Sequence, residues 1–177
     1  MARTENPSPG TDNTMLNRAK RPRTVLAGPY GHPFHPVFVT IPIGAWVASV
    51  IFDIVAMLTD TGAVFAEGAY WLIVIGVLGA LLAAVFGLMD FLTIPRGTRA
   101  FRTGLTHMVL NLVVVVVFVV DVAFRTGRGY QAPSTTGFVL SIIGLALLGF
   151  SGWLGGRLAY HYGVRVADEQ TQAEGFR

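Results

Sequence analysis

The four histidines of this chain are the side chains best suited to hold a metal ion or a haem. His32 and His35 stand three residues apart in "GHPFHP", and His107 and His161 lie far along the chain. The sequence contains no cysteine, which excludes disulfides, thiolate zinc sites, cysteine-ligated iron–sulfur clusters and cysteine nucleophiles. Any metal or haem ligand is therefore a histidine, a methionine, a carboxylate or a carbonyl oxygen.

The elements that would position these histidines are four long apolar segments. Of the 177 residues, 53% are hydrophobic and 13% are charged, whereas a soluble domain has about 25% charged residues. The segments cover about 37–59, 69–92, 105–124 and 137–160, and a helix needs about 20 residues to cross a bilayer. The valine-rich third segment favours a strand by propensity, but a lone strand in lipid would leave its backbone unpaired. The sequence therefore predicts an all-α, integral membrane four-helix bundle over residues 31–164.

Polar segments flank the four spans. Residues 1–30 are rich in Pro, Asn, Thr and Arg without periodicity, and we expect a mostly disordered basic tail there. Residues 165–177 form a second tail. The basic residues before the first span lead into a full-length helix without a cleavage site, so we expect an uncleaved anchor.

The placement of arginine and lysine predicts the orientation in the membrane. Of the 13 basic residues, five lie in the N-terminal tail, three in the loop "IPRGTRAFRTG" and three near the C-terminus, whereas the other side has only Arg125 and Arg128. Cytoplasmic loops are enriched in these residues. Both termini are therefore predicted to be cytoplasmic, in the bacterial plasma (inner) membrane, and all four histidines then lie near the cytoplasmic edge.

Further polar side chains share that depth with the histidines. Asp90 lies near the end of the second span, Asn111 is one turn past His107, and Arg157 is one turn before His161. Ionisable groups inside spans are costly and usually face a partner. An ion pair between Asp90 and Arg157 is therefore expected.

A second polar layer is predicted at the outer edge of the membrane. Asp53 and Asp121 each lie about 24 Å along helices that run in the same direction. Arg125 follows Asp121 by one helical turn. A structural ion pair is the first interpretation of this layer, and a proton-accepting role is the alternative.

Four motifs in this order resemble a known family. They are "GHPFHPVFVTIPIGAW" followed by Asp53, then "GLMDFLTIP", "HMVLN" and "SGWLGGRLAYHYGV". Together they resemble the domain-of-unknown-function 2231 family of small bacterial membrane proteins over roughly residues 31–164. The resemblance implies a four-helix membrane domain without a settled activity, and some relatives look to be joined to, or encoded near, Rieske-type or other redox proteins. The matching positions include His32, His35, Asp90, His107, Asn111, Trp153, Gly155, Gly156 and His161.

Three interpretations of the histidines stay open. In the first, two of them ligate haem b, with His107 and His161 as the natural pair, or His35 with either. In the second, His32, His35, His107 and His161 bind zinc, copper or non-haem iron, with Asp90 as a ligand or supporting partner. In the third, the histidines cap helices and form hydrogen bonds, and no cofactor binds.

The expected role is that of a redox-associated accessory subunit in the lipid bilayer, with a redox protein as partner. The alternatives are a His-rich metal-binding membrane protein and a purely structural interaction subunit. No nucleophile motif, phosphate loop or dinucleotide fingerprint occurs, so enzymatic activity is left undecided. Nucleic-acid binding is not expected. Small residues recurring every four positions in the second and fourth spans indicate close helix packing, and a homo-oligomer stays open.

Overall fold

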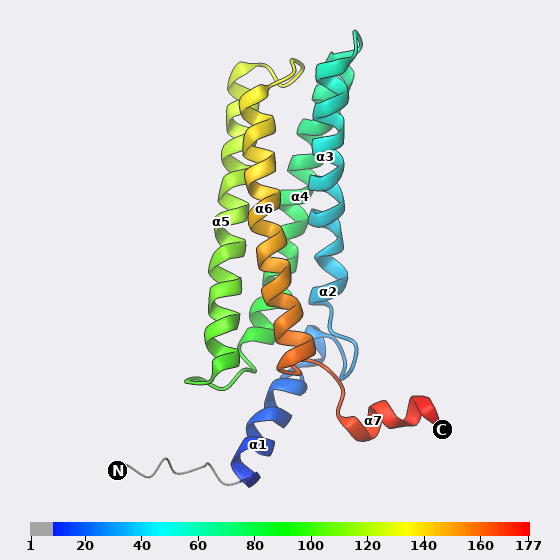
Figure 1. The fold of residues 1–177 in the computed structure, drawn as a ribbon, viewed down its shortest axis with the longest axis vertical. Helices are drawn as coiled ribbons and strands as arrows, with labels where there is room; N and C mark the ends of the chain where they lie inside the picture. The colour runs from blue at the N-terminus through cyan, green and yellow to red at the C-terminus, as the bar shows by residue number, and fades with distance from the viewer. Residues whose placement is uncertain (1–8) are drawn as a thin grey trace.

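The computed structural model describes residues 9–177, with side chains described from residue 13, and four long helical segments run side by side in it (Figure 1). The first consists of α2 (His35–Phe38) and α3 (Thr40–Leu58). The others are α4 (Gly62–Phe91), α5 (Arg99–Arg128) and α6 (Thr135–Gly156), which continues into the π-helix η2 (Arg157–His161). No strand occurs in the described residues, so the all-α four-helix prediction is confirmed.

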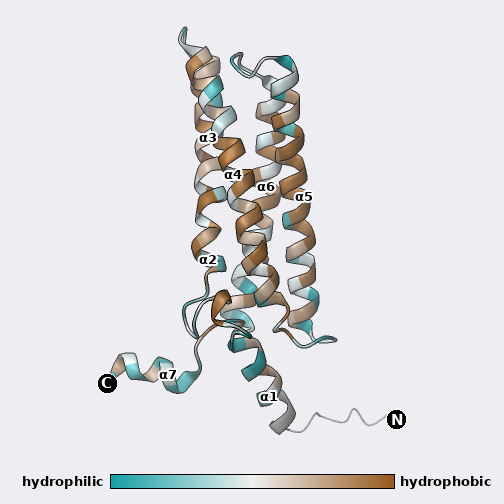
Figure 2. Cartoon of the chain, turned by 180° about the vertical axis from the view of Figure 1, so that it is seen from behind, coloured by the Kyte–Doolittle hydropathy of each residue, from teal (hydrophilic) through white to brown (hydrophobic). Residues whose placement is uncertain are grey.

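All four segments are long and apolar enough to cross a membrane. In the most apolar stretch of 18 residues in each span, only 17% to 28% is buried inside the protein. Figure 2 shows hydrophobic residues along the length of all four helices. Because their apolar side chains are not covered by other parts of this chain, the outer surface of the bundle suits contact with lipid.

The helices are longer than the apolar segments that predicted them. α4 begins at Gly62 where a start near residue 69 was expected, and α5 extends from Arg99 to Arg128. Polar residues continue α5 beyond the apolar stretch at both ends. The start of α5 is fixed by Thr98, whose side-chain oxygen accepts a hydrogen bond from the backbone N–H of Phe101 at 3.0 Å.

Successive helices are antiparallel and joined by short connections (Figure 1). α3 packs on α4, α5 packs on α6, and contacts of α4 with α5 and of α3 with α6 close the bundle. Helices α1 (Pro9–Lys20) and α7 (Glu169–Ala173) lie at the same end of the bundle, which we call the terminal end. The opposite end, with the connections α3–α4 and α5–α6, is the loop end.

An aromatic stack fills the middle of the bundle. The rings of Trp46 and Phe118 are parallel with centroids 4.0 Å apart, and Ile73 and Val114 complete this buried cluster. A Cβ atom at Gly144 would lie 2.6 Å from the Phe118 ring, so α6 can approach α5 here only with glycine. The stack thus fixes the register of helices that also carry the polar sites.

The segment before the first span contains two helices. Residues 9–30 were expected to be mostly disordered, but the structure has α1 (Pro9–Lys20) and the short helix η1 (Val25–Ala27). The expectation for residues 1–8 lies outside the described residues. The C-terminal segment likewise ends in α7 (Glu169–Ala173) and η3 (Glu174–Phe176).

Tertiary contacts explain this order. Ala19 is buried against Ile94 and Val164, and its carbonyl accepts a hydrogen bond from the backbone N–H of Arg165 at 3.0 Å. Lys20 Nζ donates to the carbonyl of Ala167 at 3.3 Å. The N-terminal and C-terminal segments therefore stabilise each other through contacts that the periodicity of either segment alone does not predict.

Candidate functional site

Two of the four histidines lie side by side in the terminal half of the bundle. The ring centroids of His35 and His107 are 6.3 Å apart, and the ring planes make an angle of 87°. His35 is the first residue of α2, and His107 lies two turns into α5. Both side chains are half-buried. We call these two residues the histidine pair.

Each ring of the pair is held through its Nδ1 atom. His35 Nδ1 lies 2.9 Å from the carbonyl oxygen of Ala83, and His107 Nδ1 lies 2.9 Å from that of Ser151. A carbonyl oxygen can only accept, so Nδ1 carries the proton in both rings, and Nε2 of the neutral ring keeps its lone pair. Histidines that bind metals are usually oriented by this kind of hydrogen bond from the second ring nitrogen.

Glycines on the neighbouring helices make room for the two rings. A Cβ atom at Gly87 of α4 would lie 2.9 Å from Cε1 of His35, and one at Gly155 of α6 would lie 3.2 Å from Cε1 of His107. Both distances are too short for a relaxed contact. Gly87, which the sequence indicated as a packing position, and Gly155, a position of the family motif, thus both contact the histidine pair.

The Nε2 atoms of the two rings differ in their surroundings. Nδ2 of Asn111, one turn past His107 as expected, lies 3.1 Å from His107 Nε2 and donates to the His107 carbonyl at 2.9 Å. Ser151 Oγ lies 3.0 Å from His107 Nδ1, and Ser151 is fully buried. Within the described chain, no hydrogen bond engages Nε2 of His35.

His32 and His161 are placed apart from the histidine pair. His161 ends η2, and its ring contacts Tyr162 with centroids 4.9 Å apart. His32 lies in the turn before α2, where its backbone N–H donates to the carbonyl of Pro29. Among residues 9–177, no three His, Cys, Asp or Glu side chains are grouped to hold a metal ion. Of the haem pairings considered, the structure brings together His35 with His107, and not His107 with His161.

The ion pair expected between Asp90 and Arg157 is wrong. Asp90 pairs instead with Arg165, whose Nε lies 2.7 Å from Asp90 Oδ1. Arg157 lies over the rings of Trp153 and Tyr162, at 5.8 Å and 5.6 Å from their centroids. The chain turns back after η2 and brings residues beyond the helix to the end of α4. Helical spacing along the fourth span could not predict this return.

Arg165 also ties the N-terminal segment to the bundle. Its Nη2 atom donates to the carbonyls of Ala27 and Gly28 at 3.0 Å and 3.2 Å. Its backbone has φ of 60°, a left-handed conformation that is uncommon outside glycine. The buried ion pair with Asp90 and the two bonds to the N-terminal segment hold the Arg165 side chain in place. Nothing in the sequence pattern singled out Arg165, because it lies in the expected C-terminal tail.

A hydrogen bond also joins the two terminal segments near the surface. The hydroxyl of Tyr30 donates to Oδ2 of Asp168 at 3.0 Å, and Asp168 Oδ1 accepts from the backbone N–H of Thr171 at 2.8 Å. The bonds from Thr171, followed by the one from Tyr30, lower the pKa of Asp168 below its ordinary value. The ionised carboxylate thus caps α7 and attaches it to the N-terminal segment.

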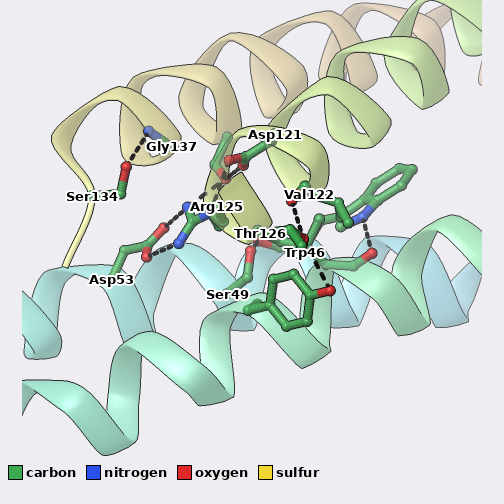
Figure 3. Close-up of polar contacts among 12 residues, drawn as sticks. Trp46, Ser49, Asp53, Asp121, Val122, Arg125, Thr126, Ser134 and Gly137 are labelled. Atoms are coloured by element: carbon green, nitrogen blue, oxygen red, sulfur yellow. Dashed lines mark hydrogen bonds and ion pairs between the residues drawn. The ribbon is translucent and has the colours of Figure 1, made fainter. Parts of the chain in front are cut away.

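A second polar site lies in the loop half (Figure 3). Arg125 Nη1 and Nη2 each donate to one carboxylate oxygen of Asp53 at 2.7 Å, and Nε donates to Asp121 Oδ1 at 2.8 Å. Ser141 Oγ donates to Asp121 Oδ2 at 2.8 Å. All four side chains are at least 97% buried. We call these residues the ionic cluster; the predicted pair of Asp121 with Arg125 is confirmed, and Asp53 joins it.

The ionic cluster links three helices, because the Arg125 guanidinium joins α5 to α3 and the Asp121 carboxylate joins α5 to α6. Asp53 belongs to α3, Asp121 and Arg125 to α5, and Ser141 to α6. A Cβ atom at Gly137 would lie 2.7 Å from Arg125 Nε, so this position admits the guanidinium only as glycine. Buried charges that are paired and fully hydrogen-bonded suit a structural role. The alternative, a proton-accepting role, stays a prediction.

One family model covers the part of the chain that contains these sites. A family model described as "Predicted membrane protein (DUF2231)" matches residues 31–168. This range contains the four spans, the histidine pair, the ionic cluster and Arg165. No curated protein and no solved structure was found to match the chain. The chain belongs to the DUF2231 family of predicted membrane proteins.

Proposed function

We propose that this membrane protein is a redox-associated accessory subunit that holds haem b between His35 and His107. The observation that carries the proposal is the spacing of two imidazoles that come from different helices. An imidazole nitrogen binds a first-row metal ion at about 2.1 Å, so two imidazoles could hold one ion between them when their centroids are about 6 Å apart. The centroids of His35 and His107 are 6.3 Å apart.

The hydrogen bonding of the histidine pair suits the same group. Both Nδ1 atoms bond to backbone carbonyls, which leaves two Nε2 lone pairs as ligands. Asn111 would release Nε2 of His107 and keep its bond to the His107 carbonyl. Bundles often hold cofactors between side chains of facing helices. A haem held there would supply one-electron transfer.

The residues next to His35 form an apolar environment for such a group. The rings of Phe38 and Phe86 are stacked with centroids 4.7 Å apart, and the Phe34 ring meets Phe86 edge-on at 5.8 Å. Phe34 precedes His35 in the chain, and Phe86 precedes Gly87. Apolar surroundings and low solvent access are among the properties by which a protein tunes a haem.

One observation favours an alternative, a structural interaction subunit without a cofactor. The amide of Asn111 already occupies Nε2 of His107. In this alternative, the neutral rings simply connect helices, His35 linking α2 to α4 and His107 linking α5 to α6. A His-rich metal site is less favoured, because His32 and His161 lie apart from the pair.

An absorption spectrum of the purified protein tests the haem proposal. Protein from haem-replete cells should show the Soret band and the reduced α band of b-type haem. His35→Ala and His107→Ala should each abolish these bands, whereas His32→Ala and His161→Ala are matched controls that should keep them. A colourless wild-type protein that also lacks stoichiometric metal would favour the cofactor-free alternative.

We infer that the terminal end faces the cytoplasm of a bacterial cell, so that an electron-transfer partner would approach the histidine pair from that side. Within the described chain, Arg125 and Arg128 are the basic residues at the loop end, and Arg125 is buried in the ionic cluster. The enrichment of cytoplasmic loops in Arg and Lys supports this orientation. Reporter fusions at the C-terminus and in the α3–α4 connection test it, and a cytoplasmic α3–α4 connection would contradict it.

A further inference from the structure

A cavity lined by arginines lies at the terminal end, outside the histidine pair. Its volume is about 470 Å³, and it lies between α1, the turn that follows α1, and the end of α4. Arg18, Arg21 and Arg23 line it together with Thr93, and none of the described residues that line it is acidic. We call it the arginine cavity.

The three arginines of the cavity are available to an anion. Their side chains are exposed, and the ion pairs of the described residues use other arginines, Arg125 and Arg165. The Arg21 guanidinium lies 5.6 Å from the centre of the Tyr30 ring, which orients it without neutralising its charge. Three like charges around one cavity repel each other, and a bound anion would relieve this repulsion. Guanidinium groups match the geometry of phosphate oxygens especially well.

The cavity lies where the chain leaves the spanning helix α4. Thr93 follows the end of α4 at Phe91 by two residues, and it is 3% exposed. Its hydroxyl donates to the carbonyl of Asp90 at 2.7 Å, which leaves the oxygen able to accept a hydrogen bond. Ala19 of α1 packs on Ile94, so the arginine-bearing segment is attached to the end of a spanning helix. Lipid headgroups occupy this level of a bilayer.

We propose that the arginine cavity binds the phosphate of an anionic phospholipid headgroup. Arg18, Arg21 and Arg23 donate to the phosphate oxygens, and Thr93 accepts from a hydroxyl of a glycerol headgroup. Basic clusters directly beside a spanning helix are a recognised means of binding anionic lipids. The site is independent of the histidine pair, so it stands whether or not haem binds.

The test uses the full-length protein and two matched sets of substitutions. The first set is Arg18→Gln, Arg21→Gln and Arg23→Gln in one chain. The control set is Arg96→Gln, Arg99→Gln and Arg102→Gln, three exposed arginines at the same end that do not line the cavity. Each protein is placed in bilayers of phosphatidylcholine with a minor fraction of phosphatidylglycerol, extracted gently and analysed by native mass spectrometry. Circular dichroism checks that both variants keep their helices.

The wild-type protein and the control set should retain phosphatidylglycerol, and the first set should bind it about a hundredfold more weakly, since each basic side chain contributes roughly a factor of five. An equal loss in both sets would show a diffuse charge effect and overturn the proposal. A further arm adds inorganic phosphate: displacement of the lipid by millimolar phosphate would identify a free phosphate compound as the ligand and overturn the lipid source. Equal retention of phosphatidylcholine and phosphatidylglycerol would also overturn it.

Discussion

The ionic cluster and the histidine pair occupy opposite halves of the same bundle, and they differ in how completely their polar atoms are used. In the ionic cluster, Arg125 donates to both Asp53 and Asp121, and every carboxylate oxygen has a partner. In the histidine pair, the rings are half-buried, and no hydrogen bond engages Nε2 of His35 within the described chain. The first site has no free acceptor for a ligand, whereas the second keeps one.

The difference separates two uses of polar side chains inside a membrane protein. Charges in the ionic cluster are stable only together, because an unpaired charge in a low-dielectric interior costs several kcal/mol, roughly 3–5. Each imidazole of the histidine pair donates from Nδ1 to a backbone carbonyl, burial of a neutral imidazole costs less than burial of an unpaired charge, and Nε2 of His35 can be offered to a ligand. The comparison predicts that substitutions in the ionic cluster unfold the protein, whereas those at the histidine pair change what it binds.

The largest effect should follow from removing the shared cation. Arg125→Leu leaves the carboxylates of Asp53 and Asp121 facing each other without a counter-charge, and we expect a loss of about 3–5 kcal/mol in stability. Thermal unfolding in detergent, followed by circular dichroism, measures it. Arg128→Leu, an exposed arginine one turn further along α5, is the control and should change little. An Arg125→Leu protein as stable as wild type would contradict the structural role of the ionic cluster, because the cluster would not then stabilise the fold.

A smaller effect on stability, but a larger one on binding, should follow from filling the space beside His107. A Cβ atom at Gly155 would lie 3.2 Å from the His107 ring, whereas one at Gly152 has nothing within 4 Å. Gly155→Val should displace the ring and cost about 1–3 kcal/mol. It should also remove the haem bands expected for the wild-type protein. Gly152→Val makes the same change on the same helix and should keep both the stability and the haem bands of the wild-type protein. Unchanged bands in Gly155→Val would argue against His107 as a ligand.

The sequence predicted the fold and the ionic cluster well, and the reason is geometric. About 20 apolar residues are needed to cross a bilayer, which identified the four spans, and residues 16 positions into two spans that run the same way lie at equal depth, which brought Asp53 to the level of Asp121. Within one helix, the four-residue spacing of Asp121 and Arg125 was enough to predict contact. These predictions therefore rested on helical periodicity and on the depth of each residue along its span.

The partner of Asp90 and the histidine that joins His107 could not be predicted in this way. Depth placed four histidines in one layer, but rotation of each helix about its axis decides which of them meet, and depth does not determine it. Arg165 reaches Asp90 through a return of the chain with a left-handed residue, beyond the end of the last helix. Gly87 and Ser151 were visible in the sequence only as small residues, and their contacts with the rings depend on the packing of neighbouring helices.

The ion pair between Asp90 and Arg165 allows a test of whether a buried charge pair stabilises the terminal half, as we expect for the ionic cluster in the loop half. Arg165→Gln removes the partner of Asp90 and weakens the attachment of the N-terminal segment at Ala27, and we expect a loss of about 1–3 kcal/mol. Released segments are cleaved faster, so the rate of trypsin cleavage after Arg18, Lys20 and Arg23 should rise. Arg157→Gln is the control because Arg157 is exposed and stacks on aromatic rings. Equal cleavage rates in the two variants would show that Arg165 does not hold the segment.

The smallest effect is expected at Asn111, and its direction distinguishes the two readings of the histidine pair. Asn111→Ala removes a donor to Nε2 of His107, so in a cofactor-free protein it should cost about 0.5–1.5 kcal/mol. If haem occupies the pair, the Nε2 atom is bound to the metal instead, and the substitution should leave both the absorption bands and the thermal midpoint close to those of the wild-type protein. Thr106→Ala, an exposed residue beside His107, controls for the change in helix propensity. Destabilisation by Asn111→Ala, with no absorption bands in any variant, would assign the histidine pair a structural role. The histidine pair and the ionic cluster would then both stabilise the fold, one with neutral groups and the other with charged ones.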